Sequence, residues 1–159
     1  MKKYLVLDMD GTIADFYGVD GWQHYLDDLQ DETPYRIAQP IYNPNILNSV
    51  LLKLKSKGWT IIINSWLSKT KTEDFHQRIR QAKLDWLSNV KLPYDSVIFL
   101  DYGTDKQESI LNLGGVQVLV DDNDDIRASW NGITIDAKEN IIPKLEALDS
   151  IFVYDKVSL

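Results

Sequence analysis

The sequence predicts an α/β fold in which helices cover both faces of a parallel sheet. Short, β-branched apolar runs alternate with longer segments of helical periodicity along most of the 159 residues. The runs are apolar throughout, which is typical of strands buried on both faces. Strands joined through helices form right-handed crossovers, so the expected arrangement is a Rossmann-like, three-layer sheet.

Each expected element has its own local signal. Short apolar runs bounded by polar turn residues predict strands at 4–7, 60–63, 97–100, 116–120 and 133–135. Periodic apolar positions predict helices at 45–57, 72–89 and 140–148. Gly58 is a stop signal for the first of these helices, and Pro143 is compatible only with the first turn of the last one. Residues 151–154 are compatible with a last strand, a packing segment or a dimer contact.

Residues 15–44 interrupt this alternation. The stretch is rich in aromatic residues and contains one short expected helix, at 22–29. It is too long for an ordinary connection and too short for a separate domain. We therefore expect one domain over residues 1–159, with 15–44 as a small cap, or lid, inserted after the first strand.

The composition excludes several classes of protein. The net charge of −7, from 24 acidic and 17 basic residues, disfavours stable binding to nucleic acid or to an anionic membrane. There are no cysteines, so disulfides and thiol chemistry are excluded. His24 and His76, both expected at the surface, are too few for a multi-histidine site. No apolar run is long enough to cross a bilayer and no signal-peptide pattern is present, so we expect a cytoplasmic protein.

Carboxylates follow the first and fourth expected strands. Asp8 and Asp10 point the same way because they lie two positions apart, and Gly11 then allows a sharp turn. Asp121 and Asp122 end the fourth strand. The carboxyl ends of parallel strands share one edge of the sheet, so these groups are expected to meet. Each pair could be a turn or an N-cap, but carboxylates this close repel one another unless a cation or a proton is shared.

A hydroxyl group and a lysine follow the second and third strands. Ser65 could hold an anion there, although a serine in that place is also a common helix cap. Lys106 lies in the loop after the third strand, and Lys69 is its competitor for the same role. Carboxylates, one hydroxyl and one lysine suit a hard divalent cation together with a phosphoryl group.

The order of these residues resembles that of the haloacid dehalogenase superfamily of aspartate-nucleophile phosphatases. The four motifs of that superfamily correspond to Asp8-x-Asp10-Gly11-Thr12, Ser65, Lys106 and Asp121-Asp122. They extend over residues 4–125. Within the superfamily the chain looks most like the 5′(3′)-deoxyribonucleotidase group, and the phosphatase domain of phage polynucleotide kinase is another relative that it resembles.

The resemblance implies a role for each catalytic candidate. Asp8 is the expected nucleophile, which forms an aspartyl-phosphate. Asp10 is the expected acid that protonates the leaving alcohol and then activates water. Ser65 is expected to hydrogen-bond a phosphoryl oxygen, and Lys106 to neutralise the charge of the phosphoryl group and the nucleophile.

The resemblance also implies Mg2+ as the cofactor. Its candidate ligands are Asp8, Asp10, Asp121 and Asp122. Asp122 is the expected direct ligand, and Asp10 is expected to contribute its backbone carbonyl. Asp121 is expected to orient Lys106 or a metal-bound water.

Four further residues complete the expected substrate site. Gly11 and Thr12 belong to the first motif. Trp22 and Tyr25 of the lid either stack on a nucleobase or pack the lid onto the core, and packing is the slightly favoured interpretation.

The expected activity is therefore Mg2+-dependent hydrolysis of a phosphomonoester. The expected partner is a small phosphorylated substrate, a nucleotide or a sugar phosphate. Two alternatives remain open at this stage: a non-catalytic or regulatory protein that binds a phosphorylated ligand, and a nucleic-acid 3′-phosphatase. The sequence does not indicate the oligomeric state.

Overall fold

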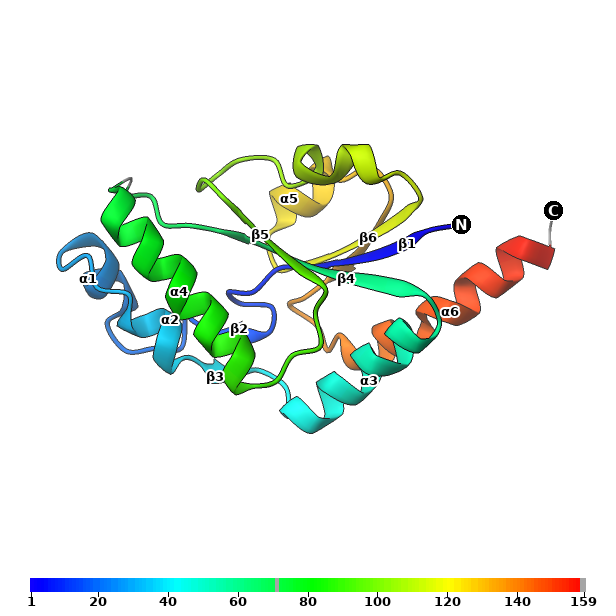
Figure 1. Cartoon of the computed structure of the whole chain (residues 1–159), viewed down its shortest axis with the longest axis horizontal. Coiled ribbons are helices and arrows are strands. Elements are labelled where there is room, and N and C mark those ends of the chain that lie inside the picture. The colour runs from blue at the N-terminus through cyan, green and yellow to red at the C-terminus, as the bar shows by residue number, and fades with distance from the viewer. Residues whose placement is uncertain (71, 158–159) are drawn as a thin grey trace.

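A five-stranded parallel sheet with the strand order β5-β4-β1-β6-β7 forms the centre of the protein (Figure 1). The computed structural model describes residues 1–70 and 72–157, with side chains described as far as residue 150. The strands are β1 (Lys3–Leu7), β4 (Trp59–Trp66), β5 (Ser96–Leu100), β6 (Val116–Asp121) and β7 (Ile133–Asp136). All five expected strands are confirmed, and β1 lies between β4 and β6, with Leu7 opposite Ile63 and Val120.

Helices cover both faces of this sheet, which confirms the expected layers (Figure 1). The helices that follow the insertion are α3 (Pro44–Ser56), α4 (Glu73–Asn89), the 3-10 helix η1 (Gln107–Leu113), α5 (Asp124–Ser129) and α6 (Ile142–Val157). Leu5 and Leu7 of β1 pack in the cluster that includes α3 and α6, whereas Tyr4 and Val6 pack in the cluster that includes η1 and α5. This alternation along one strand places a core on each side of the sheet.

The insertion between β1 and α3 folds onto α4. It contains β2 (Ala14–Asp15), α1 (Trp22–Asp27), α2 (Thr33–Ile37) and β3 (Gln39–Pro40). β2 and β3 pair antiparallel, so the two ends of the insertion meet. Phe16 stacks on Tyr35 with ring centroids 4.5 Å apart, and both pack with Phe75 and Ile79 of α4. The insertion is thus attached to the body of the protein through an apolar cluster.

Three details differ from the expectations. The backbone of residues 151–154 continues α6, so the alternative of a last strand is wrong; the side chains there lie outside the described part of the structure. His76 is only 5% exposed, because α4 turns this side chain toward the chain after β4, where its Nε2 lies 3.3 Å from the carbonyl oxygen of Ser68. The short helices α2, α5 and η1 were not expected.

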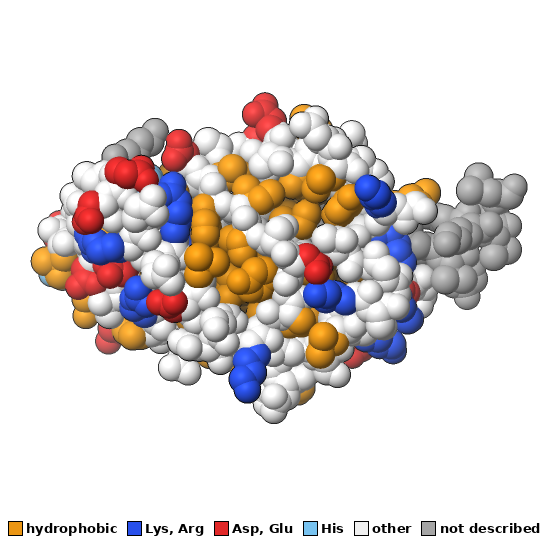
Figure 2. Space-filling view, in the orientation of Figure 1, with side chains coloured by type: hydrophobic (Ala, Val, Ile, Leu, Met, Phe, Trp, Pro, Cys, Tyr) orange, Lys and Arg blue, Asp and Glu red, His pale blue; other side chains and the backbone are white. Residues whose placement is uncertain are grey.

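Strand β5 leaves apolar surface at one edge of the sheet. Its last four residues, 97–100, are each half-buried, and hydrophobic side chains gather at the centre of the face shown in Figure 2. Within the described residues, no helix combines the length and the hydrophobicity that a membrane span requires.

Candidate active site

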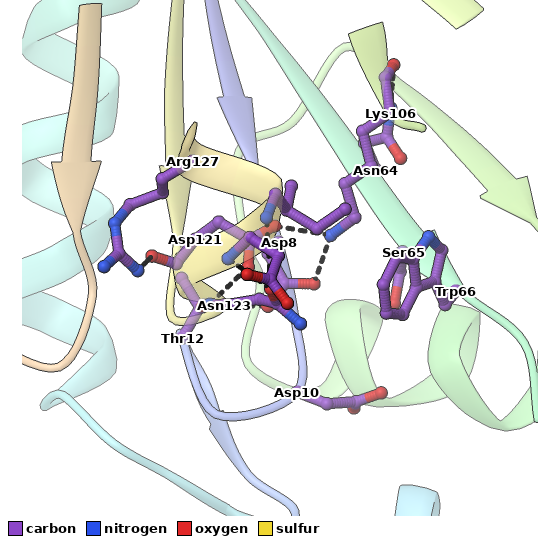
Figure 3. A network of polar contacts seen from close by, with 12 residues as sticks. Asp8, Asp10, Thr12, Asn64, Ser65, Trp66, Lys106, Asp121, Asn123 and Arg127 are labelled. Carbon is purple, nitrogen blue, oxygen red and sulfur yellow. Dashed lines mark hydrogen bonds and ion pairs between the residues drawn. The ribbon is translucent and has the colours of Figure 1, made fainter. Parts of the chain in front are cut away.

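The predicted site residues surround the carboxyl ends of β1 and β6. The backbone N–H of Asp8 donates to Val120 O over 3.0 Å, so the nucleophile candidate continues the β1–β6 ladder by one residue. Asp121 is the last residue of β6. The sheet therefore fixes these two carboxylates side by side, as Figure 3 shows.

A tight turn after Asp8 aims a hydroxyl group back at it. The N–H groups of Thr12 and Ile13 both donate to Met9 O, over 3.1 and 3.0 Å, and Gly11 has a φ of 78°. The turn brings Thr12 Oγ1 to 2.8 Å from Asp8 Oδ2. Thr12 is fully buried, so the structure places it as a support of Asp8 beneath the surface of the site.

Lys106 joins the two carboxylates. It lies immediately before η1, and its Nζ is 2.8 Å from Asp8 Oδ1 and 2.7 Å from Asp121 Oδ2 (Figure 3). Its side chain is 3% exposed. Burial alone disfavours the charged form, but the charges of Asp8 and Asp121 outweigh it and raise the pKa of Lys106. The ammonium group thus stays charged between the two carboxylates.

Three carboxylates form a group that could hold a metal ion. Asp8, Asp121 and Asp122 each offer an oxygen, and these oxygens all lie within 4.8 Å of one another. Burial, and then the charges of Asp8 and Asp121, raise the pKa of Asp122 to about 8. Burial, and then the charge of Asp8, also raise the pKa of Asp121. Carboxylates this crowded need a shared proton or a cation, so their oxygens fit a hard divalent ion.

Gly11 leaves room for this group. A Cβ atom at residue 11 would lie 2.2 Å from Asp122 Oδ2 and 2.9 Å from a ring carbon of Tyr17. The backbone of the turn therefore approaches the carboxylates as closely as a residue without a side chain permits.

Asp10 points away from the other carboxylates. Its Oδ2 lies 2.8 Å from the Nζ of Lys83, a lysine of α4. Burial raises the pKa of Asp10, while the charge of Lys83 acts in the opposite direction. Asp10 is thus separate from the three-carboxylate group, and its side chain is not among the metal-ligand candidates that the geometry brings together.

Lys83 is the residue that sequence reasoning missed. It is 0% exposed, and its Nζ also contacts Ser65 Oγ and Trp66 O, both over 2.7 Å. The signal was its spacing: Lys83 lies four residues after Ile79, on the buried face of a helix that the sequence did predict. A lysine in an apolar stripe needs a buried partner, and it could have been paired with a strand-end carboxylate on that ground.

The other predicted residues differ in whether they reach the cavity beside Asp8. Ser65 is fully buried and contacts Lys83, and it is not among the residues that line the cavity beside Asp8. Trp22 lines that cavity and Tyr25 does not. Lys69, the competitor of Lys106, is exposed, lies 5.0 Å over the ring of Tyr102 and also lines the cavity, but Lys106 is the lysine that contacts Asp8.

The cavity beside Asp8 has a volume of about 170 Å3. Its polar lining includes Asp8, Asp10, Lys69, Lys106, Asp121 and Asp122. The aromatic lining comes from both the insertion and the body, and consists of Phe16, Tyr17, Trp22, Tyr35, Trp66 and Tyr102. A phosphoryl group at the carboxylates would thus have flat, apolar surfaces beside it.

No family model and no curated protein matches the chain. Among solved structures, a chain of the Pnkp1/Rnl/Hen1 RNA repair complex is similar, with 20% identity and a TM-score of 0.58, over 86% of this chain and 42% of that one. D,D-heptose 1,7-bisphosphate phosphatase from B. bronchiseptica, solved with magnesium and phosphate, has 11% identity and a TM-score of 0.47, over 96% of this chain and 99% of that one.

The chain spans less than half the length of the RNA repair chain, and the likeness to it shows a shared fold. The α/β fold that the sequence predicted is thereby confirmed. Membership of the deoxyribonucleotidase group stays a prediction.

Proposed function

We propose that the protein hydrolyses phosphomonoesters with the help of Mg2+. The observation that carries this proposal is the arrangement of Asp8 at the wall of the cavity, where it contacts Lys106 and has carboxylate oxygens of Asp121 and Asp122 within 4.8 Å. A nucleophile, a cation and a group for a divalent ion then lie around one point, as phosphoryl transfer requires.

The charges of the site support the divalent ion. If Asp8, Asp10, Asp121 and Asp122 were all ionised, their four charges would exceed those of the two buried ammonium groups by two. The raised pKa values of Asp10, Asp121 and Asp122 reflect this excess, which a divalent ion would offset. Asp8 and Asp122 would hold the ion, with Asp121 beside them. Bound there, it would neutralise charge on the phosphoryl oxygens.

Two carboxyl groups would carry the chemistry. Asp8 attacks phosphorus, and the ester P–O bond breaks while Asp10 gives its proton to the leaving oxygen. Water then attacks the aspartyl-phosphate, its proton goes to Asp10, and the P–O bond to Asp8 breaks, which releases phosphate. Lys106 stays charged throughout and offsets the negative charge of the nucleophile and the phosphoryl group.

The aromatic lining favours a nucleotide over a sugar phosphate as the substrate. Trp22 lies in the insertion, Trp66 and Tyr102 lie in the body, and all three line the cavity. Flat rings of this kind stack on bases, at about 1–3 kcal/mol per base. We accordingly propose that residues 15–44 act as a small cap over a nucleotide.

The test is phosphate release by the purified protein, with Mg2+ and with a chelator instead. The substrates are p-nitrophenyl phosphate, 5′- and 3′-nucleotides, sugar phosphates and 3′-phosphorylated oligonucleotides. We expect turnover that needs Mg2+ and that Asp8→Asn lowers at least about 1000-fold. Asp125→Asn is the matched control, because Asp125 is exposed and lies outside the cavity.

Two results would contradict the proposal. Turnover that survives Asp8→Asn would remove the nucleophile assignment. Thermal stabilisation by nucleotides without any turnover would instead favour a protein that only binds a phosphorylated ligand.

A further inference from the structure

Lys83 uses its whole donor capacity inside the protein. Its Nζ lies 2.8 Å from Asp10 Oδ2, 2.7 Å from Ser65 Oγ and 2.7 Å from Trp66 O. An ammonium group has three hydrogens, so these three acceptors account for all of them. Lys83 therefore has no donor to offer a phosphoryl group, and any part that it has in catalysis acts through its neighbours.

Asp10 is the neighbour that reaches the cavity. Its side chain is 18% exposed and lines the cavity, whereas the side chain of Lys83 is fully buried behind it. Lys83 holds only the Oδ2 atom. Within the described part of the chain, Asp10 Oδ1 has no hydrogen-bond partner, so one oxygen is fixed and the other is free to meet a leaving group.

The helix holds Lys83 firmly in this place. Ile79 and Phe75, one and two turns before it on α4, are fully buried in the cluster with the insertion. The ring of Tyr35 lies 4.7 Å from the Lys83 Nζ. A buried ammonium group loses its hydration and keeps its place only while its partners remain, so Lys83 and Asp10 depend on each other.

We propose that Lys83 is a positioning residue, which holds Asp10 for proton transfer to the leaving oxygen. This inference rests on the proposed function. When the ester bond breaks, the proton moves from Asp10 to the leaving oxygen, and Lys83 keeps its own protons. The carboxylate that results is then stabilised by the ammonium group beside it.

Two substrates of similar shape distinguish a loss of proton transfer from a general loss of catalysis. 4-Nitrophenyl phosphate releases a phenolate that needs little protonation, whereas 4-nitrobenzyl phosphate releases an alkoxide that needs it. The ratio kcat/KM covers the steps up to loss of the leaving group. We expect Lys83→Met to lower kcat/KM about 100-fold for the benzyl ester and less than about threefold for the phenyl ester. Lys55→Met, which removes a distant ion pair with Asp95, is the matched control.

The double variant tests whether Lys83 acts through Asp10. In the Asp10→Asn background, we expect Lys83→Met to lower kcat/KM for the benzyl ester by less than about twofold. An equal loss on both esters in the single variant, no loss on either, or a further large loss in the double variant would overturn the inference. A wild-type protein inactive on both esters would instead refute the proposed function.

Folding is checked by circular dichroism and thermal melting of each variant. If Lys83→Met does not fold, Lys83→Gln gives the same comparison with a polar side chain. The double variant removes both charges together, so it leaves no unpaired buried ion. The selective loss on the benzyl ester is the result expected from Lys83→Gln as well, and an equal loss on both esters would again overturn the role.

Discussion

At the scale of single residues, Gly11 shows how closely backbone and carboxylates approach each other. Its φ of 78° is costly for a residue with a side chain, and a Cβ atom there would lie 2.2 Å from Asp122 Oδ2. A side chain at residue 11 would therefore be disfavoured twice, by the backbone conformation and by its contact with Asp122. The second of these would also disturb a candidate metal ligand.

Replacing Gly11 with alanine should harm both stability and metal binding. We expect Gly11→Ala to cost about 1–3 kcal/mol in the free energy of unfolding, measured by urea denaturation. We also expect Mg2+ affinity, measured by calorimetry, to fall at least about tenfold. Gly114→Ala is the control, because it shares the positive φ, 64°, but has nothing within 4 Å of the new Cβ. Equal Mg2+ affinity in the two variants would contradict the close approach at Gly11.

The raised pKa of Asp122 predicts a pH dependence of the metal-free protein. This carboxyl keeps its proton up to about pH 8 when folded, but releases it at about 3.9 when unfolded. Between these values the folded state binds more protons, so the free energy of unfolding should fall as the pH rises from about 4 to about 8. Asp10 and Asp121, whose pKa values burial also raises, act in the same direction.

Urea denaturation in the presence of a chelator measures this slope. Asp122→Asn should make it shallower, because the amide does not titrate. A slope in Asp122→Asn as steep as in the wild type would show that other groups cause the decline.

At the scale of elements, α1 presents two aromatic residues with different surroundings. Trp22 lines the cavity and lies 5.2 Å, between ring centroids, from both Phe16 and Tyr17. Tyr25 is half-buried on the same helix and does not line the cavity. The helix therefore offers a candidate substrate residue, Trp22, and a matched control, Tyr25, three positions apart.

Truncation of these two residues should separate substrate binding from lid packing. We expect Trp22→Leu to raise KM for a nucleotide about tenfold, because a stacking surface is lost. Tyr25→Leu should change it less than about twofold. Steady-state kinetics on one nucleotide would measure both, and similar effects from the two variants would mean that α1 acts only by packing.

At the scale of the whole molecule, the site draws its charges from segments distant in sequence. Asp8 follows β1 directly, Lys106 directly precedes η1, Asp121 ends β6, and α4 adds Lys83. An ion that binds these carboxylates links parts of the chain that separate on unfolding, so it should stabilise the fold as a whole.

Mg2+ should therefore raise the melting temperature. A ligand at 100 times its Kd adds about 2.7 kcal/mol, which corresponds to roughly 5–10 °C for a chain of this size. Differential scanning calorimetry with Mg2+ and with a chelator measures the shift. Asp122→Asn should lose most of it and Asp125→Asn should keep it. A shift that Asp122→Asn retains would place the ion elsewhere.

The sequence was sufficient for the sheet and for the residues that follow its strands. Asp8, Lys106 and Asp121 could be placed together because parallel strands bring their carboxyl ends to one edge, whatever the exact helix packing. Lys83 was missed: its spacing marks it as buried and in need of a partner, but the strand-end group that it meets depends on how α4 is rotated against the sheet. The two-residue strands β2 and β3 escaped prediction for a similar reason, since segments this short carry no periodic signal.

The position of β1 has a consequence for how the proposed activity would respond to heating. With β4 bonded along one side and β6 along the other, the strand before Asp8 has no exposed edge from which to fray. Amide protons of Val6 and Leu7 should exchange with solvent only when the entire fold opens. If Asp8 is the nucleophile, as proposed, loss of activity by heat or denaturant should coincide with global unfolding rather than precede it.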